Sequence, residues 1–343
     1  MSVQTLVYPF PEAPSGIASI EVAPGVHWLR FALPWSLNHI NLWLLDDGDA
    51  VCVVDTGLGD PPSRGLWTEL IATLGRPVSR IIVTHYHPDH LGNADWLARA
   101  TGAPTWLALG EYLLAHAVHA QTSGFDAASM LAHFRRHGLD ATRLATMEAR
   151  GNVYRRGVPT LPAQHQRLLD GDLLRIGGRD WQAIAGYGHS PEHISLYCAE
   201  AALLISGDML LPRITTNISV SAALPDEDSV GRFLASLRRF EPLAADTLVL
   251  PAHGLPFRGV HARVGQLFAH HAERDNTLLQ ALAIPQSAAE LLQTLFTREL
   301  DAHQLMFAMG EAIAHLNHLW QRGALQRIEE NDEPLRYQIL PCS

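Results

Sequence analysis

The segment Thr84-His85-Tyr86-His87-Pro88-Asp89-His90 decides how the rest of this chain is interpreted. It directly follows the apolar run 80–83, which predicts a β-strand. A strand that runs into this segment would present His85 and His87 on one side. Pro88 then stiffens the turn that follows. Imidazole and carboxylate groups at this density are costly to bury unless a divalent cation compensates for them. The alternative is a polar loop that happens to be rich in His.

The composition of the 343 residues is that of a globular chain with a sizeable core. The length allows two domains, and no apolar run is long enough to span a membrane. The N-terminus has no basic region followed by an apolar segment, so we expect no secretory signal and a cytoplasmic protein. Cys52, Cys198 and Cys342 have no metal-like or disulfide-like spacing, and the first two are expected to be buried apolar residues.

The charge balance narrows the classes of partner. The formal net charge is −10, and all 25 basic residues are Arg because the sequence contains no Lys. No lysine nucleophile or Schiff base is therefore available. An acidic chain also lacks the electrostatic basis of most nucleic-acid binding.

Further apolar runs end in the same way, with a His or Asp at the tip. These residues are Asp55, His189, Asp208 and His253. Strands of one sandwich that end at one rim would bring all of them to the His-rich segment. Taken alone, Asp55 fits an ordinary turn as well as it fits a position that lines a site.

Residues 111–150 form a different kind of segment. Helical patterns at 111–120, 127–137 and 141–149 carry an apolar stripe, which predicts an insertion rather than an independent domain. The stripe either packs on the parent domain or forms a lid over a substrate.

The C-terminal part is expected to form a long helix and a small separate unit. Residues 260–283 have a helical pattern, and Ser287 with Glu290 forms a capping box at the start of another helix. A further helix is predicted over 302–322, followed by a hairpin whose strands are 325–329 and 335–339. Helices followed by a hairpin favour a winged helix.

The His-x-His-x-Asp-His motif, together with Asp55, His189, Asp208 and His253, resembles the metallo-β-lactamase-fold hydrolases. The resemblance implies an α/β fold, a four-layer αβ/βα sandwich of two sheets with helices outside. The expected domains are 1–258, which includes the insertion, and 259–343. The motif set is similar to the glyoxalase-II-like pattern, since true β-lactamases of this fold lack the bridging Asp.

The resemblance implies a ligand set for two divalent ions, expected to be zinc with iron or manganese as alternatives. The first ion would be held by His85, His87 and His189, the second by Asp89, His90 and His253, and Asp208 would bridge both. Asp55 would hydrogen-bond a ligand and fix its orientation, and His193 would support the site.

The same resemblance implies that a hydroxide shared by the two ions attacks an acyl carbonyl. Asp89 and Asp208 would be the catalytic residues, with Asp89 orienting the nucleophile. No motif of the G-x-S-x-G kind supplies a different nucleophile. Around the site, Tyr187 either contacts the substrate or packs in the core, Arg213 is a candidate anchor for a carboxylate or phosphate, and Asn217 would line one wall.

We therefore expect an enzyme that hydrolyses a thioester or ester of a small acyl substrate, with lactone or β-lactam opening as side activities. The alternatives are a phosphodiesterase or endoribonuclease with the same site, or a non-catalytic regulator. The tail resembles the winged-helix domain attached to a lactamase-β-like subgroup. Residues 285–343 contain four Arg and eight acidic residues, so we expect a packing module or homodimer contact rather than a nucleic-acid surface.

Overall fold

The computed structural model describes residues 5–296, 299–331 and 333–340, which divide into two compact units. The first unit takes the chain up to His119, then Val153–Thr216 and Ser236–Val264. The second unit contains Ala120–Asn152, Asn217–Ala235 and the chain from Gly265 onward. Cys342 lies outside the described residues.

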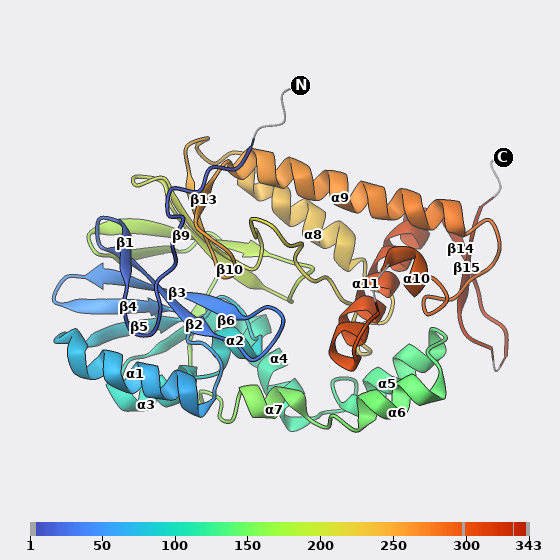
Figure 1. Cartoon of the computed structure of the whole chain (residues 1–343), viewed down its shortest axis with the longest axis horizontal. Coiled ribbons are helices and arrows are strands. Elements are labelled where there is room, and N and C mark those ends of the chain that lie inside the picture. The colour runs from blue at the N-terminus through green and yellow to red at the C-terminus, as the bar shows by residue number, and fades with distance from the viewer. Residues whose placement is uncertain (1–4, 297–298, 332, 341–343) are drawn as a thin grey trace. The chain divides into compact units, whose positions relative to one another are not determined.

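The first unit contains a mixed seven-stranded sheet, drawn in blue to green in Figure 1. Its strands, in spatial order, are β1 (Ile20–Ala23), β2 (Val26–Ala32), β3 (His39–Asp47), β4 (Ala50–Val54), β5 (Val78–Ile82), β6 (Thr105–Ala108) and β7 (Gln166–Leu168). The first four strands pair antiparallel, and β4 to β7 pair parallel. The parallel pairing brings the carboxyl ends of β4 and β5 to the same edge.

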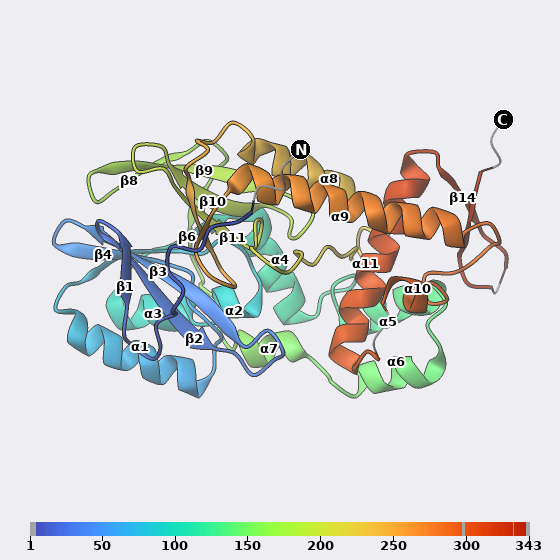
Figure 2. The ribbon, with the colours of Figure 1, turned by 45° about the horizontal axis from the view of Figure 1, so that its top comes forward.

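A second mixed sheet of six strands completes the sandwich, as the turned view in Figure 2 shows. Its strands, in spatial order, are β13 (Phe257–Arg258), β12 (Leu248–Pro251), β11 (Leu203–Gly207), β10 (His193–Cys198), β9 (Arg179–Gly186) and β8 (Leu173–Ile176). Only β11 and β12 pair parallel, so their carboxyl ends also share an edge. Two sheets with helices outside confirm the predicted fold class.

Apolar side chains fill the space between the sheets and under the outer helices. Trp28 and Trp43 from the first sheet pack in one cluster with Trp181 from the second. The other face of the first sheet is covered by α1 (Pro61–Leu74) and α3 (Ala94–Thr101), as Figure 1 shows. Burial of this apolar surface is the main term that holds the strand tips in place.

Local sequence signals explain where α1 begins and ends. The Asp60 side chain accepts a hydrogen bond from the Ser63 N–H, and a proline occupies the first helical position. Gly75 ends the helix with a φ of 66°, a conformation that glycine adopts at low cost.

The remaining helices of the first unit lie close to the loops that leave the strands. They are α2 (Pro88–Leu91), α4 (Leu109–Ala120), α7 (Val153–Gly157) and the short 3₁₀ helix η1 (Arg238–Phe240). Both α2 and α4 begin directly after strand-to-loop transitions of the first sheet. They therefore place side chains beside the predicted site.

The second unit is built from three segments that are far apart in sequence. Its elements are α5 (Ala127–Arg136), α6 (Ala141–Glu148), most of α8 (Ser229–Leu237) and α9 (Val260–Ala281), α10 (Leu292–Leu295), α11 (Ala302–Gln321), β14 (Leu325–Ile328) and β15 (Arg336–Ile339). The predicted helices of the insertion and the predicted C-terminal hairpin are all present.

Backbone hydrogen bonds join the insertion to the C-terminal segment. The Ala289 N–H donates to the His137 carbonyl at 3.1 Å, and the Leu335 N–H donates to the Arg136 carbonyl at 2.8 Å. We expected domains of 1–258 and 259–343, with 111–150 as an insertion in the first. The contacts group residues 120–152 with the C-terminal segment, and a lid function for them stays a prediction.

A chain of His and Asp side chains links α9 and α11 with Asp228, which directly precedes α8. His271 Nδ1 lies 3.3 Å from His315 Nε2, whose other ring nitrogen lies 2.8 Å from an Asp275 oxygen. At the far end, His318 Nδ1 lies 2.8 Å from an Asp228 oxygen. Buried polar groups of this kind are stable only when they are paired with one another.

A search for membrane spans among the described helices found none of sufficient length and apolar character.

The buried His271 predicts acid sensitivity of the second unit. Burial, helped by His315, His270, His318 and Arg274, lowers the pKa of His271 to about 3. The unfolded chain takes up a proton near pH 6.5, whereas the folded chain does not, so stability is lost as pH falls below 6.5. We expect His271 to account for about 2 kcal/mol of the stability lost between pH 7 and pH 5.

Urea unfolding followed by circular dichroism at the two pH values tests this expectation. The His271→Phe variant should lose less stability than the parent on acidification. Substitution of the exposed His261 by Gln should leave the loss of stability between the two pH values unchanged. An identical pH dependence of the parent and His271→Phe would contradict the assignment.

Candidate metal centre

The predicted site residues follow the ends of five strands. Asp55 follows β4, the His85 segment follows β5, and His189 lies in the loop after β9. Asp208 follows β11, and His253 follows β12. The packing of the two sheets brings these loops together, as the strand-tip pattern predicted.

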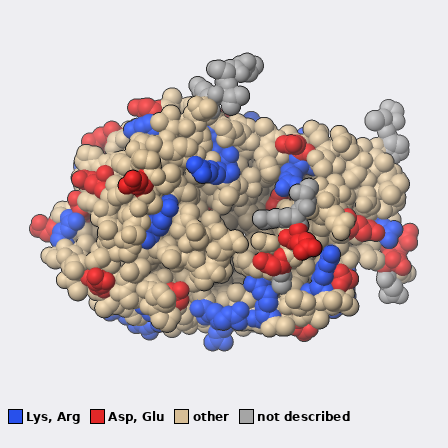
Figure 3. Space-filling view, viewed as in Figure 1, with Lys and Arg blue, Asp and Glu red and all other residues tan. Residues whose placement is uncertain are grey.

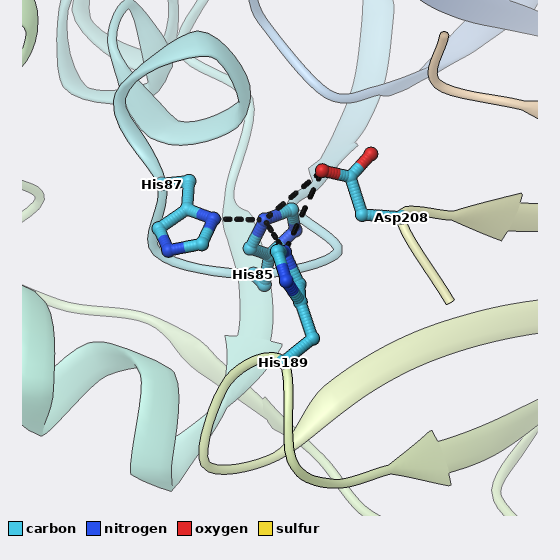
Figure 4. Close-up of side chains that lie close together, drawn as sticks. All are labelled: His85, His87, His189 and Asp208. Carbon is cyan, nitrogen blue, oxygen red and sulfur yellow. Dashed lines mark hydrogen bonds and ion pairs between the residues drawn. The ribbon is translucent and has the colours of Figure 1, made fainter. Parts of the chain in front are cut away.

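One cluster contains three imidazoles and a carboxylate, from His85, His87, His189 and Asp208, whose ligand atoms lie within 4.8 Å of one another. Figure 4 shows these side chains pointing toward a common point. His85 Nε2 lies 2.8 Å from His87 Nδ1 and 3.1 Å from His189 Nε2. Three ring nitrogens that converge in this way can share one cation.

A second cluster contains Asp89, His90 and His253, all buried and again within 4.8 Å. An Asp89 carboxylate oxygen lies 3.4 Å from His253 Nε2 and 3.8 Å from His90 Nε2. This arrangement offers one oxygen and two nitrogen donors.

The carboxylate of Asp208 faces both clusters with different oxygens. Its Oδ2 lies 3.5 Å from His189 Nε2 and 4.0 Å from His85 Nε2. Its Oδ1 lies 3.6 Å from His90 Nε2 and 3.4 Å from His253 Nε2. A carboxylate in this position can bridge two cations.

The electrostatics of the clusters suit a cation. Burial, helped by the neighbouring His189, lowers the pKa of His87 to about 3, so this imidazole is neutral and can donate a lone pair. Burial would raise the pKa of Asp208, but His253 and His90 hold it well below the usual value. The carboxylate is therefore negative, and burial keeps the imidazoles of His85 and His87 in the same cluster neutral.

Asp55 and Thr84 orient ligands through atoms that do not face the clusters. An Asp55 oxygen lies 2.7 Å from His90 Nδ1, and the other accepts a hydrogen bond from the Thr84 N–H at 2.8 Å. The Thr84 hydroxyl lies 3.0 Å from His85 Nδ1. These contacts leave Nε2 of both histidines pointing into the centre, which is the role expected for Asp55. The backbone of Asp55 has a φ of 62°, in the left-handed region.

His193 and His39 support the loops of the second sheet. His193 Nε2 accepts a hydrogen bond from the Asp208 N–H at 3.1 Å, so it lies behind the bridging residue as a supporting group. His253 Nδ1 lies 2.7 Å from the His39 carbonyl, and the Gly254 N–H donates to the His39 ring. Thr84 and His39 were not among the residues predicted from sequence.

The three predicted substrate residues each make other contacts. Tyr187 is partly exposed, and its N–H donates to Ser236 Oγ. The guanidinium of Arg213 lies over the Tyr8 ring at 5.6 Å. Asn217 belongs to the second unit and donates to Ser219 Oγ. Their roles toward a substrate stay predictions.

The segment that follows Asp208 is held by Arg263, which was not predicted from the sequence. Arg263 is buried, and its guanidinium donates to the carbonyls of Leu211 and Ile214. These bonds fix the path of the segment that carries Arg213.

The donor set fits two divalent ions. Five imidazoles and two carboxylates face one another, a combination that suits zinc, iron or manganese. Among the described residues, His90 Nε2 and Asp208 Oδ1 are buried without a hydrogen-bond partner. Polar atoms orphaned at the middle of a cluster are accounted for by a bound ion.

Comparison with known proteins agrees with this geometry. A family model described as the metallo-beta-lactamase superfamily matches residues 35–253. A second model, described as the metallo-beta-lactamase-like C-terminal domain, matches residues 276–340. The crystal structure of a beta-lactamase domain protein from Burkholderia ambifaria is 43% identical, covers 98% of each chain and has a TM-score of 0.91.

Two curated relatives are more distant. A hydroxyacylglutathione hydrolase from Cereibacter sphaeroides is 24% identical over 71% of this chain and 74% of its own. An atrochrysone carboxyl ACP thioesterase from Aspergillus fumigatus is 22% identical over 76% of this chain and 70% of its own. The resemblance inferred from the motifs is confirmed.

The position of Asp55 predicts that it controls one ion. Asp55→Asn tolerates the positive φ but sets an amide nitrogen against either His90 Nδ1 or the Thr84 N–H. We expect the affinity for the ion at Asp89, His90 and His253 to fall by about 10- to 100-fold. Zinc content after dialysis against a graded chelator measures this.

The matched control is Asp60→Asn, because Asn caps the N-terminus of α1 as well as Asp does. If Asp55→Asn keeps both ions up to the same chelator concentration as the parent protein does, Asp55 does not orient His90.

Proposed function

This chain belongs to the metallo-beta-lactamase superfamily, and from that premise we propose that it hydrolyses a carboxylic thioester or ester. The observation that carries the proposal is the Asp208 carboxylate, which faces a His-rich cluster with each oxygen. A carboxylate in this position can hold two ions close enough to act together.

The bound ions would supply two kinds of chemistry, because a pair of divalent cations polarises a carbonyl oxygen and lowers the pKa of a shared water. We propose zinc as the metal, since imidazole with carboxylate suits it. His85, His87 and His189 would hold one ion and Asp89, His90 and His253 the other, with Asp208 facing both.

Asp89 is the residue that we propose to orient the attacking water and to move its proton. Its side chain is nearly buried, and one of its oxygens lies 3.4 Å from His253 Nε2. A carboxylate fixed in this way can accept a proton from the water and pass it to the leaving group. Neither a serine nor a cysteine nucleophile is required for this reaction.

The choice of an acyl rather than a phosphoryl group rests on charge and on the relatives. The chain has a net charge of −10, and the face drawn in Figure 3 carries acidic side chains interspersed among the Arg side chains. A single-stranded nucleic acid is bound more readily by a continuous basic groove. The names of both distant relatives refer to acyl transfer to water from a glutathione or carrier-protein conjugate.

The first experiment tests the bridge. Asp208→Asn keeps the size of the side chain but removes the charge that both ions share. We expect kcat/KM for a thioester to fall by more than about 100-fold, beyond the loss typical of residues that only orient ligands. Glu200→Gln, an exposed change in the preceding turn, should have no effect. Undiminished hydrolysis by Asp208→Asn would refute a two-ion mechanism.

The second experiment tests the substrate class. The zinc-containing protein is assayed with acyl-CoA and acylglutathione thioesters, a carboxylic ester, a lactone, a β-lactam, a phosphodiester and single-stranded RNA. We expect thioesters or esters to be hydrolysed fastest, with activity lost on chelation and restored by zinc. Faster cleavage of the phosphodiester or RNA would favour the alternative of a nuclease.

A further inference from the structure

The side chain of Glu111 is fully buried in the first turn of α4, although it is a carboxylate with no cation at hydrogen-bond distance among the described residues. Burying a carboxylate is costly unless several donors compensate for the lost water. Three donors do so here, and all three come from the loops that carry metal ligands.

Two loops from different sheets meet at this carboxylate. The Tyr86 N–H donates to Glu111 Oε2 at 2.9 Å. The Ser190 hydroxyl and the Glu192 N–H each donate to Glu111 Oε1 at 2.7 Å. Tyr86 lies between His85 and His87 in the chain, and Ser190 directly follows His189, so both loops are held close to ligands of the first cluster.

A reciprocal bond closes the arrangement. The Gly110 N–H donates to Glu192 Oε2 at 2.9 Å, so the loop after His189 and the start of α4 hold each other. A Cβ at position 110 would lie 3.2 Å from the Glu192 side chain, which is closer than ordinary contact. On its other side, the Tyr86 carbonyl accepts a hydrogen bond from the Tyr154 hydroxyl at 2.8 Å.

The register of neither sheet sets the distance between these two loops. The His85 segment follows β5 of the first sheet, and the His189 loop follows β9 of the second. At their base they are joined by one backbone bond, from the Ile194 N–H to the Thr84 carbonyl. Beside the ligands, the Glu111 carboxylate contacts both loops.

We propose that Glu111 is a positioning residue that fixes His85 and His87 relative to His189 and thereby sets the affinity of the ion held with Asp208. The proposal rests on the two-ion centre of the proposed function. Glu111 then positions side chains of the first cluster, whereas Asp55 orients His90 of the second cluster.

The hydrogen bonds that join the two loops at Glu111 require a carboxylate. Two oxygens accept from three donors, whereas an amide side chain has one acceptor oxygen and an NH₂ group. Glu111→Gln therefore keeps the shape of the side chain but sets a donor against the Tyr86 N–H or against the Ser190 and Glu192 donors. One of the loops has to move.

The test measures zinc binding to the full chain by competition with a chromophoric chelator. We expect Glu111→Gln to bind one ion with the parent's affinity and the other about 10- to 100-fold more weakly. Tyr112→Phe is the matched control, because it removes a hydrogen bond from the same helix to the Ala163 carbonyl. Unchanged affinity for both ions in Glu111→Gln would overturn the proposal.

Double variants identify which ion is affected. In His253→Ala, which retains the first cluster, adding Glu111→Gln should weaken the remaining ion. In His87→Ala, which retains the second cluster, adding Glu111→Gln should change little. A general structural role would weaken both ions equally and would contradict the proposal.

A milder variant keeps the proposal testable if Glu111→Gln does not fold. Ser190→Ala removes one of the three donors and should weaken the same ion by a smaller factor, and no change in this variant would then overturn the proposal. Because binding is measured without substrate, a protein that binds two ions but hydrolyses neither a thioester nor an ester would refute the proposed function alone.

Discussion

The first unit is organised around the mutual placement of two carboxylates and five imidazoles in a space that excludes most water. Without cations, such a group would repel itself or exchange protons until part of it became neutral. The sheets bring these groups together because their strands end at one rim, and the apolar core between the sheets supplies the free energy that holds the ends there. Cations bound by these groups would therefore stabilise the folded unit.

Ligand side chains alone do not define the centre, because an imidazole has two nitrogens and can rotate. The non-ligating atoms are held by Asp55, Thr84, His39 and His193, each through a hydrogen bond to a ligand or to its backbone. Glu111 acts at a coarser level, since it fixes two loops rather than one ring. The site is thus determined by its supporting contacts as much as by its ligands.

The second unit combines a segment inserted in the sequence with segments from the C-terminal part of the chain. Residues 120–152 form backbone hydrogen bonds with the C-terminal segment, and Asp228 from a third segment pairs with His318 of α11. The His and Asp side chains of α9 and α11, together with Asp228 before α8, are paired along a chain rather than arranged around a common point. They stabilise the packing of the second unit.

The sequence by itself determined the fold class, because alternating strands and helices with a His or Asp at five strand tips are typical of very few folds. It also determined the candidate ligands, since metal binding requires particular residue types at close spacing. Only the tertiary structure decided which side chains orient them. Glu111 is an acidic residue in the first turn of a helix, where solvent-exposed acids are common, and Thr84 and His39 have equally ordinary local settings. Their roles depend on hydrogen bonds between residues 25 to 215 positions apart, and no local pattern encodes such contacts.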